Sequence, residues 1–185
     1  MAIFPLSPSE ISLLSPLVEQ HRYKKYQYIR PMPARAIQKY TLHQLEKTAE
    51  EGQVWVEKSG DTVQAYLAVK KLKWDTEILG FPCARIIDCY APEPYTVGFP
   101  LARELLKKMC AWAQEENISF IDVRVDTRNM VWVHALEEAG FRTMEVAILY
   151  AFVKGYGELF TRPEPTCKVR LANAEDLDFL HRVAG

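Results

Sequence analysis

The sequence has few cysteines, and they form no pattern that binds a metal or builds a disulfide framework. The four cysteines lie at irregular intervals, with no C-x-x-C pair and no histidine at metal-ligand spacing. Cys110 falls among the apolar positions of a helical pattern, where a free cysteine usually acts as a small hydrophobic residue. We therefore predict neither a metal site nor a cysteine nucleophile.

The sequence also lacks an excess of either charge and any long apolar run. Lys and Arg number 23 against 24 Asp and Glu, so no large net charge attracts the chain to nucleic acid or to an anionic membrane. No apolar run approaches the roughly 20 residues that span a bilayer, and residues 1–8 lack the pattern of a signal peptide. We predict a cytoplasmic protein with no nucleic-acid partner and no membrane partner.

The chain has enough apolar residues for one substantial core, since 49% of its 185 residues are hydrophobic. Its apolar positions alternate between the spacing of a helix and the spacing of a strand. The expected helices lie at 7–18, 41–51, 100–115 and 129–138, and the expected strands at 54–56, 63–69, 83–90, 118–125 and 144–153. A right-handed crossover makes strands 83–90 and 118–125 parallel, which predicts an α/β fold with a mixed sheet flanked by helices.

The helix expected at 129–138 carries the most specific motif of the sequence. Asn129 precedes this helix, Gly140 supplies a left-handed stop, and Phe141 returns an aromatic ring to the core. Residues 123–141, together with the order of the elements over about 9–153, resemble the GNAT superfamily of acetyltransferases. The resemblance implies the acyl-CoA N-acyltransferase fold, with a mostly antiparallel sheet, and acetyl transfer from acetyl-CoA to a small-molecule amine.

The segment that would bind the cofactor departs from the pattern of that family. GNAT enzymes hold the CoA pyrophosphate with a loop of the form Gln/Arg-x-x-Gly-x-Gly/Ala, and residues 97–102 correspond to it. Ala102 matches, but Val97 replaces the polar residue, and Pro100 replaces a glycine and has no amide to donate. We predict a degenerate acetyl-CoA site and doubtful binding. The cofactor-binding candidates that remain are Gly98, Leu101, Ala102 and Asn129.

The residues expected to move protons are also incomplete. The family often places a tyrosine seven residues after the asparagine as general acid, and Leu136 stands there in this chain. Trp132 occupies a position where a small alanine is usual. The remaining catalytic candidates are Asp88 and Glu77, which could activate an amine through water, and Tyr150, which could replace the acid. Asp88 could equally be a strand-edge carboxylate, and Tyr150 a packing residue.

The end of the sequence suggests a boundary between domains. Residues 1–156 would form the GNAT-like domain, and residues 157–167 have the composition of a linker. Residues 168–185 resemble the first strand and helix of a second, truncated GNAT domain. Alternatively, they are the last strand and terminal helix of the first domain.

The segment from Trp74 to Phe81, with Ala84 and Arg85, indicates one particular group within the GNAT superfamily. It is similar to part of two-part acetyltransferases such as TDP-fucosamine acetyltransferase, in which a CoA-poor amino-terminal half precedes the catalytic half. This implies a non-catalytic domain that packs on the catalytic GNAT domain of the same longer protein or on a second copy. The alternatives are a self-sufficient acetyltransferase with a divergent pyrophosphate loop and a non-enzymatic interaction module.

Overall fold

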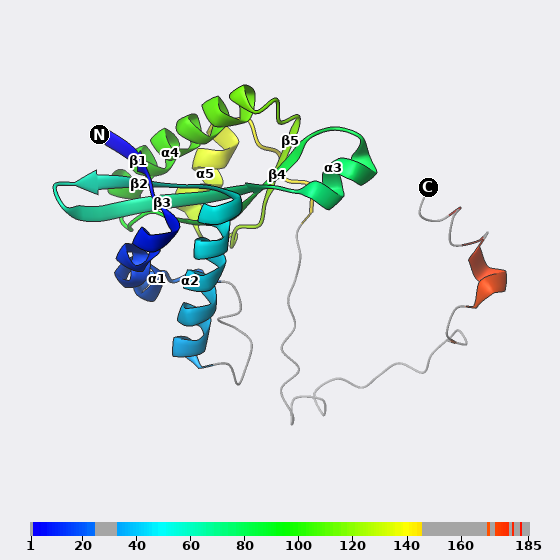
Figure 1. Ribbon diagram of the computed structural model, residues 1–185, viewed down its shortest axis with the longest axis horizontal. Helices are drawn as coiled ribbons and strands as arrows, with labels where there is room; N and C mark the ends of the chain where they lie inside the picture. The colour runs from blue at the N-terminus through cyan, green and yellow to red at the C-terminus, as the bar shows by residue number, and fades with distance from the viewer. Residues whose placement is uncertain are drawn as a thin grey trace. The chain divides into compact units, whose positions relative to one another are not determined.

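The computed structural model describes residues 2–24, 33–145, 170, 173–177, 179 and 182. The chain divides into two units, Met1–Leu149 and Tyr150–Gly185. In its described part, the larger unit contains a sheet with the strand order β1-β2-β3-β4-β5 (Figure 1). The strands are β1 (Ala2–Pro5), β2 (Gly52–Ser59), β3 (Thr62–Lys71), β4 (Cys83–Tyr90) and β5 (Phe120–Val123). Neighbouring strands are antiparallel except β4 and β5, which are parallel.

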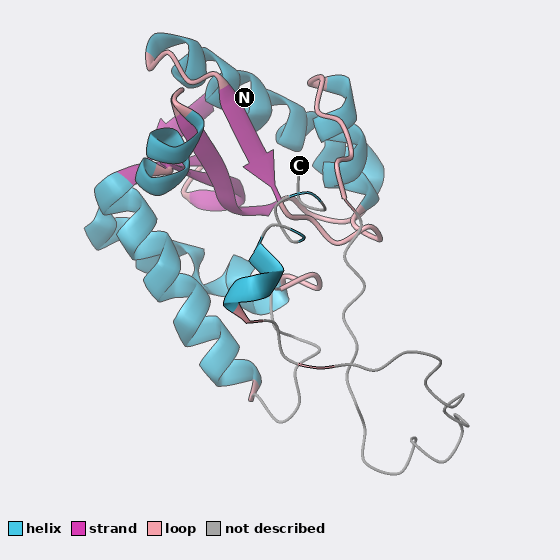
Figure 2. Cartoon of the chain, turned by 90° about the vertical axis from the view of Figure 1, so that its right-hand side faces the viewer, coloured by secondary structure: helices cyan, strands magenta, loops and turns pink. Residues whose placement is uncertain are grey.

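Helices cover both faces of this sheet (Figure 2). On one face, here called the α1/α2 face, lie η1 (Pro8–Leu14), α1 (Ser15–Gln20) and α2 (Ala34–Glu51). On the other, the α4/α5 face, lie α4 (Tyr95–Glu115) and α5 (Met130–Glu138). Each face buries its own apolar cluster because side chains alternate between the two faces along each strand. The predicted mixed and mostly antiparallel sheet flanked by helices is therefore confirmed.

The most local predictions agree with the structure. The alternating pattern after Gly52 forms the β2–β3 hairpin, whose turn contains Gly60 at a φ of +60°. Strand β4 has the predicted bounds, and its crossover through α4 leads to the parallel partner β5. Helix α5 begins after Asn129 and is followed by Gly140 at a φ of +94°.

Several boundaries were predicted wrongly. Helix α4 begins at Tyr95 rather than Pro100, because Pro94 takes the capping position and Pro100 lies inside the helix. Helix α2 begins at Ala34 rather than residue 41, and β5 is shorter than the strand expected at 118–125. Strand β1 and helix α3 (Lys73–Leu79) were not predicted.

Some predictions fall on residues that the structure does not describe. The strand expected at 144–153 lies outside the described residues from position 146 onward, as does the proposed linker at 157–167. In the smaller unit, η3 (Ala174–Asp176) follows Asn173, whose side chain accepts a hydrogen bond from the Glu175 amide. Among the described residues, no helix is both long and apolar enough to span a membrane.

Candidate functional site

The segment predicted to hold the CoA pyrophosphate forms the first turns of helix α4. The amides of Val97 and Gly98 both donate to the Pro94 carbonyl at 3.0 Å, as in the first turn of a helix. Gly98 is buried, and a Cβ atom at this position would clash with the Pro92 carbonyl oxygen. It would also lie 3.2 Å from Cγ1 of Val131 on α5. The helix, the preceding loop and α5 therefore meet without space between them at Gly98.

The other cofactor-binding candidates are also packing residues. Leu101 and Ala102 lie in the apolar cluster of the α4/α5 face. Asn129 is buried at the start of α5, where its amide donates to the Asp126 carbonyl at 2.9 Å and its carbonyl accepts from the Val133 amide at 3.0 Å. The structure thus gathers the candidates around the meeting point of α4 and α5, where Leu101 and Ala102 belong to the apolar core and Asn129 links the backbone at the start of α5.

The predicted positions near the thioester are apolar and buried. Leu136 lies in the cluster between α4 and α5, where it cannot protonate a leaving group. Trp132 is completely buried, and its indole Nε1 has no hydrogen-bond partner among the described residues. An unpartnered buried N–H is unusual and costs free energy, so shape complementarity must hold this side chain in place.

Strand β4 is irregular where it passes the end of β5. Ala68 of β3 pairs with Asp88, whereas the next residue, Val69, pairs with Ile86, so Ile87 forms a bulge. The parallel pairs with β5 run from Cys83 to Ile86. Asp88 therefore lies just past both the bulge and the last described pair. Open α/β sheets bind ligands beyond the carboxyl ends of their strands, which makes this end of β4 the place to look for a site.

Asp88 belongs to a polar group on the α1/α2 face, which we call the histidine cluster: the buried His21 and Tyr66 and the half-buried Asp88 and Tyr90. One carboxylate oxygen of Asp88 accepts from the Tyr66 hydroxyl at 3.0 Å, and the other accepts from the Cys89 amide at 3.0 Å. Tyr66 is completely buried. Burial, reinforced by the charge of Asp88, raises the pKa of Tyr66 well above its usual value, so Tyr66 remains a proton donor to the carboxylate.

His21 stands at the end of helix α1 and completes the cluster. Its side chain is 6% exposed and packs edge-on against the ring of Tyr90, with 5.5 Å between ring centroids. Burial lowers the pKa of His21, and the nearby charge of Asp88 only partly opposes this effect. The imidazole is therefore held neutral, and its Nε2 has no hydrogen-bond partner among the described residues. A neutral, desolvated imidazole can accept or donate one further hydrogen bond.

Charged groups form the rim of the histidine cluster. Arg22 binds Glu93 at 2.9 Å, and the guanidinium of Arg128 lies 5.9 Å from the centre of the Tyr23 ring. Burial and the charge of Glu93 raise the pKa of Tyr23. The end of α1, the loop before α4 and the start of α5 thus converge here. A carboxylate beside aromatic rings suits a small cationic amine.

Sequence reasoning located one member of this cluster and missed three. Asp88 was identified by its position on a strand, but His21, Tyr66 and Tyr90 come from distant parts of the sequence and no local motif marks them. Glu77 is exposed on helix α3. No described interaction joins its side chain to that of Asp88, so the structure does not bring these two candidates together. Tyr150 lies outside the described residues. Among the described residues, no group of His, Cys, Asp and Glu could hold a metal ion.

The sequence matches no family model and no curated protein, but the structure resembles solved acetyltransferases. A ribosomal-protein-alanine N-acetyltransferase from Brucella melitensis has a TM-score of 0.59 at 12% identity, with 82% of this chain and 100% of that chain covered. A predicted acetyltransferase from Clostridium acetobutylicum, solved with acetyl-CoA, has a TM-score of 0.56 at 17% identity, covering 80% and 95%.

A putative acetyltransferase from an Arthrobacter species gives a similar result, with a TM-score of 0.56 at 14% identity and coverage of 83% and 96%. Identities this low establish the fold and not the activity. The finer resemblance to two-part acetyltransferases remains a prediction. The chain has the fold of the GNAT-type acetyltransferases.

Proposed function

We propose that this chain is a GNAT-fold domain that does not transfer acetyl groups itself and that serves a catalytic acetyltransferase domain as a packing and acceptor-binding partner. The observation that carries the proposal is the closed start of helix α4. Gly98 lies against the Pro92 carbonyl there, and its amide is already donated to Pro94. The catalytic domain would belong to the same longer protein.

Acetyl transfer by this fold depends on outward-pointing amides that residues 97–102, the segment aligned with the pyrophosphate loop, do not offer. A pyrophosphate is held by backbone amides that point outward from a helix start and a glycine-rich turn. In this chain the amides of Val97 and Gly98 bond within the helix, and Pro100 has no amide. A bound pyrophosphate would need to displace the loop at Pro92 from its contact with Gly98.

The chemistry of the whole enzyme would then be divided between two domains. A deprotonated amine attacks the thioester carbonyl of acetyl-CoA, and the thiolate leaves with a proton. Leu136 cannot supply that proton, which supports assigning this step to the partner domain. This chain would contribute the carboxylate of Asp88, which Tyr66 holds in place, to a site for the cationic acceptor.

Calorimetric titration with acetyl-CoA tests the proposal. We expect no heat of binding up to about 1 mM ligand. A dissociation constant of about 1 mM corresponds to a binding free energy of only about −4 kcal/mol, so weak binding would still be detected. The Clostridium acetobutylicum neighbour solved with acetyl-CoA is the positive control. Micromolar binding by the unmodified chain would overturn the proposal and favour the self-sufficient enzyme.

The variant Pro100→Gly separates two reasons for weak binding. This substitution restores a backbone amide but leaves the contact between Gly98 and Pro92 in place. We therefore expect the variant to bind no better than the unmodified chain. Recovery of binding would show that the missing amide alone blocks the site and that the packing at Gly98 does not.

A further inference from the structure

Helix α3 and the residues just after it carry a concentration of exposed apolar side chains that no described part of the chain covers. Four of them lie close together in the sequence: Trp74, Ile78, Leu79 and Phe81, with exposed fractions of 69%, 65%, 49% and 39%. Trp74 and Ile78 are four residues apart and share one side of the helix. None of the residues of this helix is buried. We call these four residues the α3 patch.

Hydrogen bonds, rather than apolar packing, hold helix α3 in place. The Thr76 hydroxyl accepts from the Cys83 amide at 2.9 Å, and the Leu72 amide donates to the Cys83 carbonyl at 2.8 Å. In Figure 1, the turn of the β2–β3 hairpin lies at one end of the sheet and helix α3 lies beyond the other end. The helix stands out from the sheet there. The backbone is thus fixed to the start of β4 while the apolar side chains face outward.

We propose that the α3 patch is the contact surface for a second copy of this chain. A face that packs on itself across a two-fold axis must be self-complementary. If one residue contacts a second residue of the partner, that second residue also contacts the first residue of the partner. Two charged residues beside the α3 patch meet this condition. Lys73 and Glu77 border Trp74 and Ile78 at the same four-residue spacing, at opposite ends of the helix.

Antiparallel packing of two α3 helices brings opposite charges together. Lys73 of one copy then lies opposite the partner's Glu77, and the reverse pair forms at the other end. Among the described residues, neither Lys73 nor Glu77 takes part in an ion pair within the chain. Within one helix, a lysine four residues before a glutamate is the less favourable order, so pairing within each helix competes only weakly with pairing to a partner.

The size of the patch sets the expected strength of the contact. Soluble monomers rarely expose an apolar patch above about 300–600 Å², whereas a standard interface buries about 800 Å² per partner. The four exposed side chains, two of them aromatic, can form the apolar centre of such an interface. The rest of the contact area would come from the polar residues around them. We therefore expect a reversible dimer of roughly micromolar strength.

Sedimentation velocity of the full chain, from about 1 µM to about 500 µM, tests this inference across the expected range of dissociation constants. We expect the mass to rise from monomer to dimer with concentration. The variant Ile78→Glu should remain monomeric throughout, and Leu13→Glu, which alters an exposed leucine on η1, should dimerise normally. A full chain that stays monomeric at the highest concentration overturns the inference, and so does normal dimerisation by Ile78→Glu. Thermal unfolding confirms that each variant is folded.

Charge reversal identifies the partner as a second copy in antiparallel orientation. Lys73→Glu places two glutamates opposite each other at both ends and should weaken the dimer by about tenfold or more. Lys73→Glu combined with Glu77→Lys restores opposite charges and should recover the wild-type association. Lys47→Glu on the exposed side of α2 controls for the change in net charge. Failure of the double variant to recover would exclude the antiparallel arrangement.

This inference goes beyond the proposed function, because self-association requires neither acetyl-CoA nor a catalytic domain. The two can fail separately. Acetyl-CoA binding by a dimeric chain would refute only the proposed function. A monomeric chain that does not bind acetyl-CoA would refute only the use of the α3 patch by a second copy.

Discussion

The α4/α5 face of the sheet buries apolar side chains around Gly98 and Trp132, whereas the α1/α2 face buries an imidazole and a phenol beside a carboxylate. Buried polar groups cost stability unless they are hydrogen-bonded, so they persist where some role requires them. Under the proposed function, the α4/α5 face therefore serves packing, while the α1/α2 face keeps groups able to bind an acceptor.

The largest effect should come from removing the indole that fills the α4/α5 face. Trp132→Ala should lower the free energy of unfolding by about 3–5 kcal/mol, because a completely buried aromatic side chain is lost and a cavity remains. Urea denaturation followed by circular dichroism measures the change. Trp74→Ala, which alters an exposed tryptophan, is the matched control and, at protein concentrations too low for dimerisation, should cost less than about 0.5 kcal/mol. Equal losses in the two variants would contradict the assignment of Trp132 to the core.

The contact at Gly98 should show the next largest effect. Gly98→Ala inserts a methyl group against the Pro92 carbonyl, and relief requires backbone movement, at a cost of about 2–3 kcal/mol. Val97→Ala, at the exposed neighbouring position, should change stability by a few tenths of a kcal/mol. A neutral Gly98→Ala variant would mean that the start of α4 is loosely packed and has room for a cofactor.

On the α1/α2 face, the Tyr66 hydroxyl should contribute less than either packing residue. Tyr66→Phe removes the donor to Asp88 and should cost about 1–2 kcal/mol, since the carboxylate loses one of its two hydrogen bonds. Tyr90→Phe is the control, because its hydroxyl has no described hydrogen-bond partner. If both variants lose the same free energy of unfolding, the hydrogen bond between Tyr66 and Asp88 does not stabilise the fold more than an ordinary tyrosine hydroxyl does.

The smallest effect is the dependence of stability on pH that His21 introduces. Its pKa is lowered in the folded state, so the unfolded chain binds more protons between the folded value and about 6.5. Stability from this group is thus complete above pH 6.5 and falls as pH decreases, with a slope of at most about 1.4 kcal/mol per pH unit.

Denaturation curves between pH 5 and pH 8 measure this slope for the wild type and for His21→Gln. The substitution should remove the contribution of His21. A wild-type slope that survives in His21→Gln would assign it to other groups.

The elements that could be predicted from the sequence are those with a local physical cause. Alternation after Gly52 specifies the hairpin, and the left-handed Gly140 specifies the end of α5. The start of α4 was misplaced because the rule that proline favours the first turn was applied to Pro100, whereas Pro94 caps the helix and Pro100 lies inside it. Only the contact of Gly98 with the preceding loop distinguishes them, and that contact is tertiary.

The candidate site was harder to predict than the fold. Asp88 could be chosen as a carboxylate on a strand, but its bond to Tyr66 depends on a strand register that a bulge at Ile87 alters. His21 approaches Asp88 only when α1 packs across the sheet. No spacing rule within a sequence encodes such an approach, so the histidine cluster could emerge only from the folded chain.

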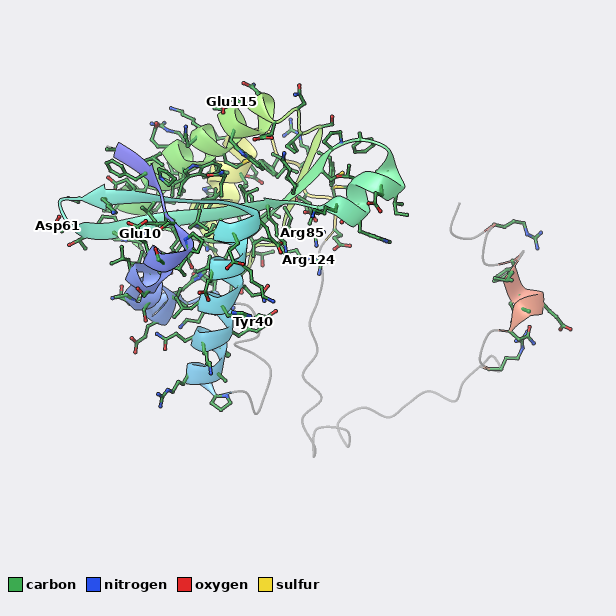
Figure 3. All side chains as sticks on the ribbon, in the orientation of Figure 1. Glu10, Tyr40, Asp61, Arg85, Glu115 and Arg124 are labelled. Carbon is green, nitrogen blue, oxygen red and sulfur yellow. The ribbon has the colours of Figure 1, made fainter. Side chains whose placement is uncertain are left out.

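The parallel pairing of β4 with β5 has a consequence for folding during synthesis. Arg85 of β4 (Figure 3) binds both carboxylate oxygens of Asp122 on β5, with distances of 2.7 to 3.0 Å, and fixes the register of the pair. The 21 residues of α4 separate the two strands, so this pairing closes a longer loop than the β2–β3 hairpin does and should form later. A nascent chain on the ribosome therefore exposes the edge of β4 until β5 has emerged, and during that interval β4 can pair with a strand of another chain.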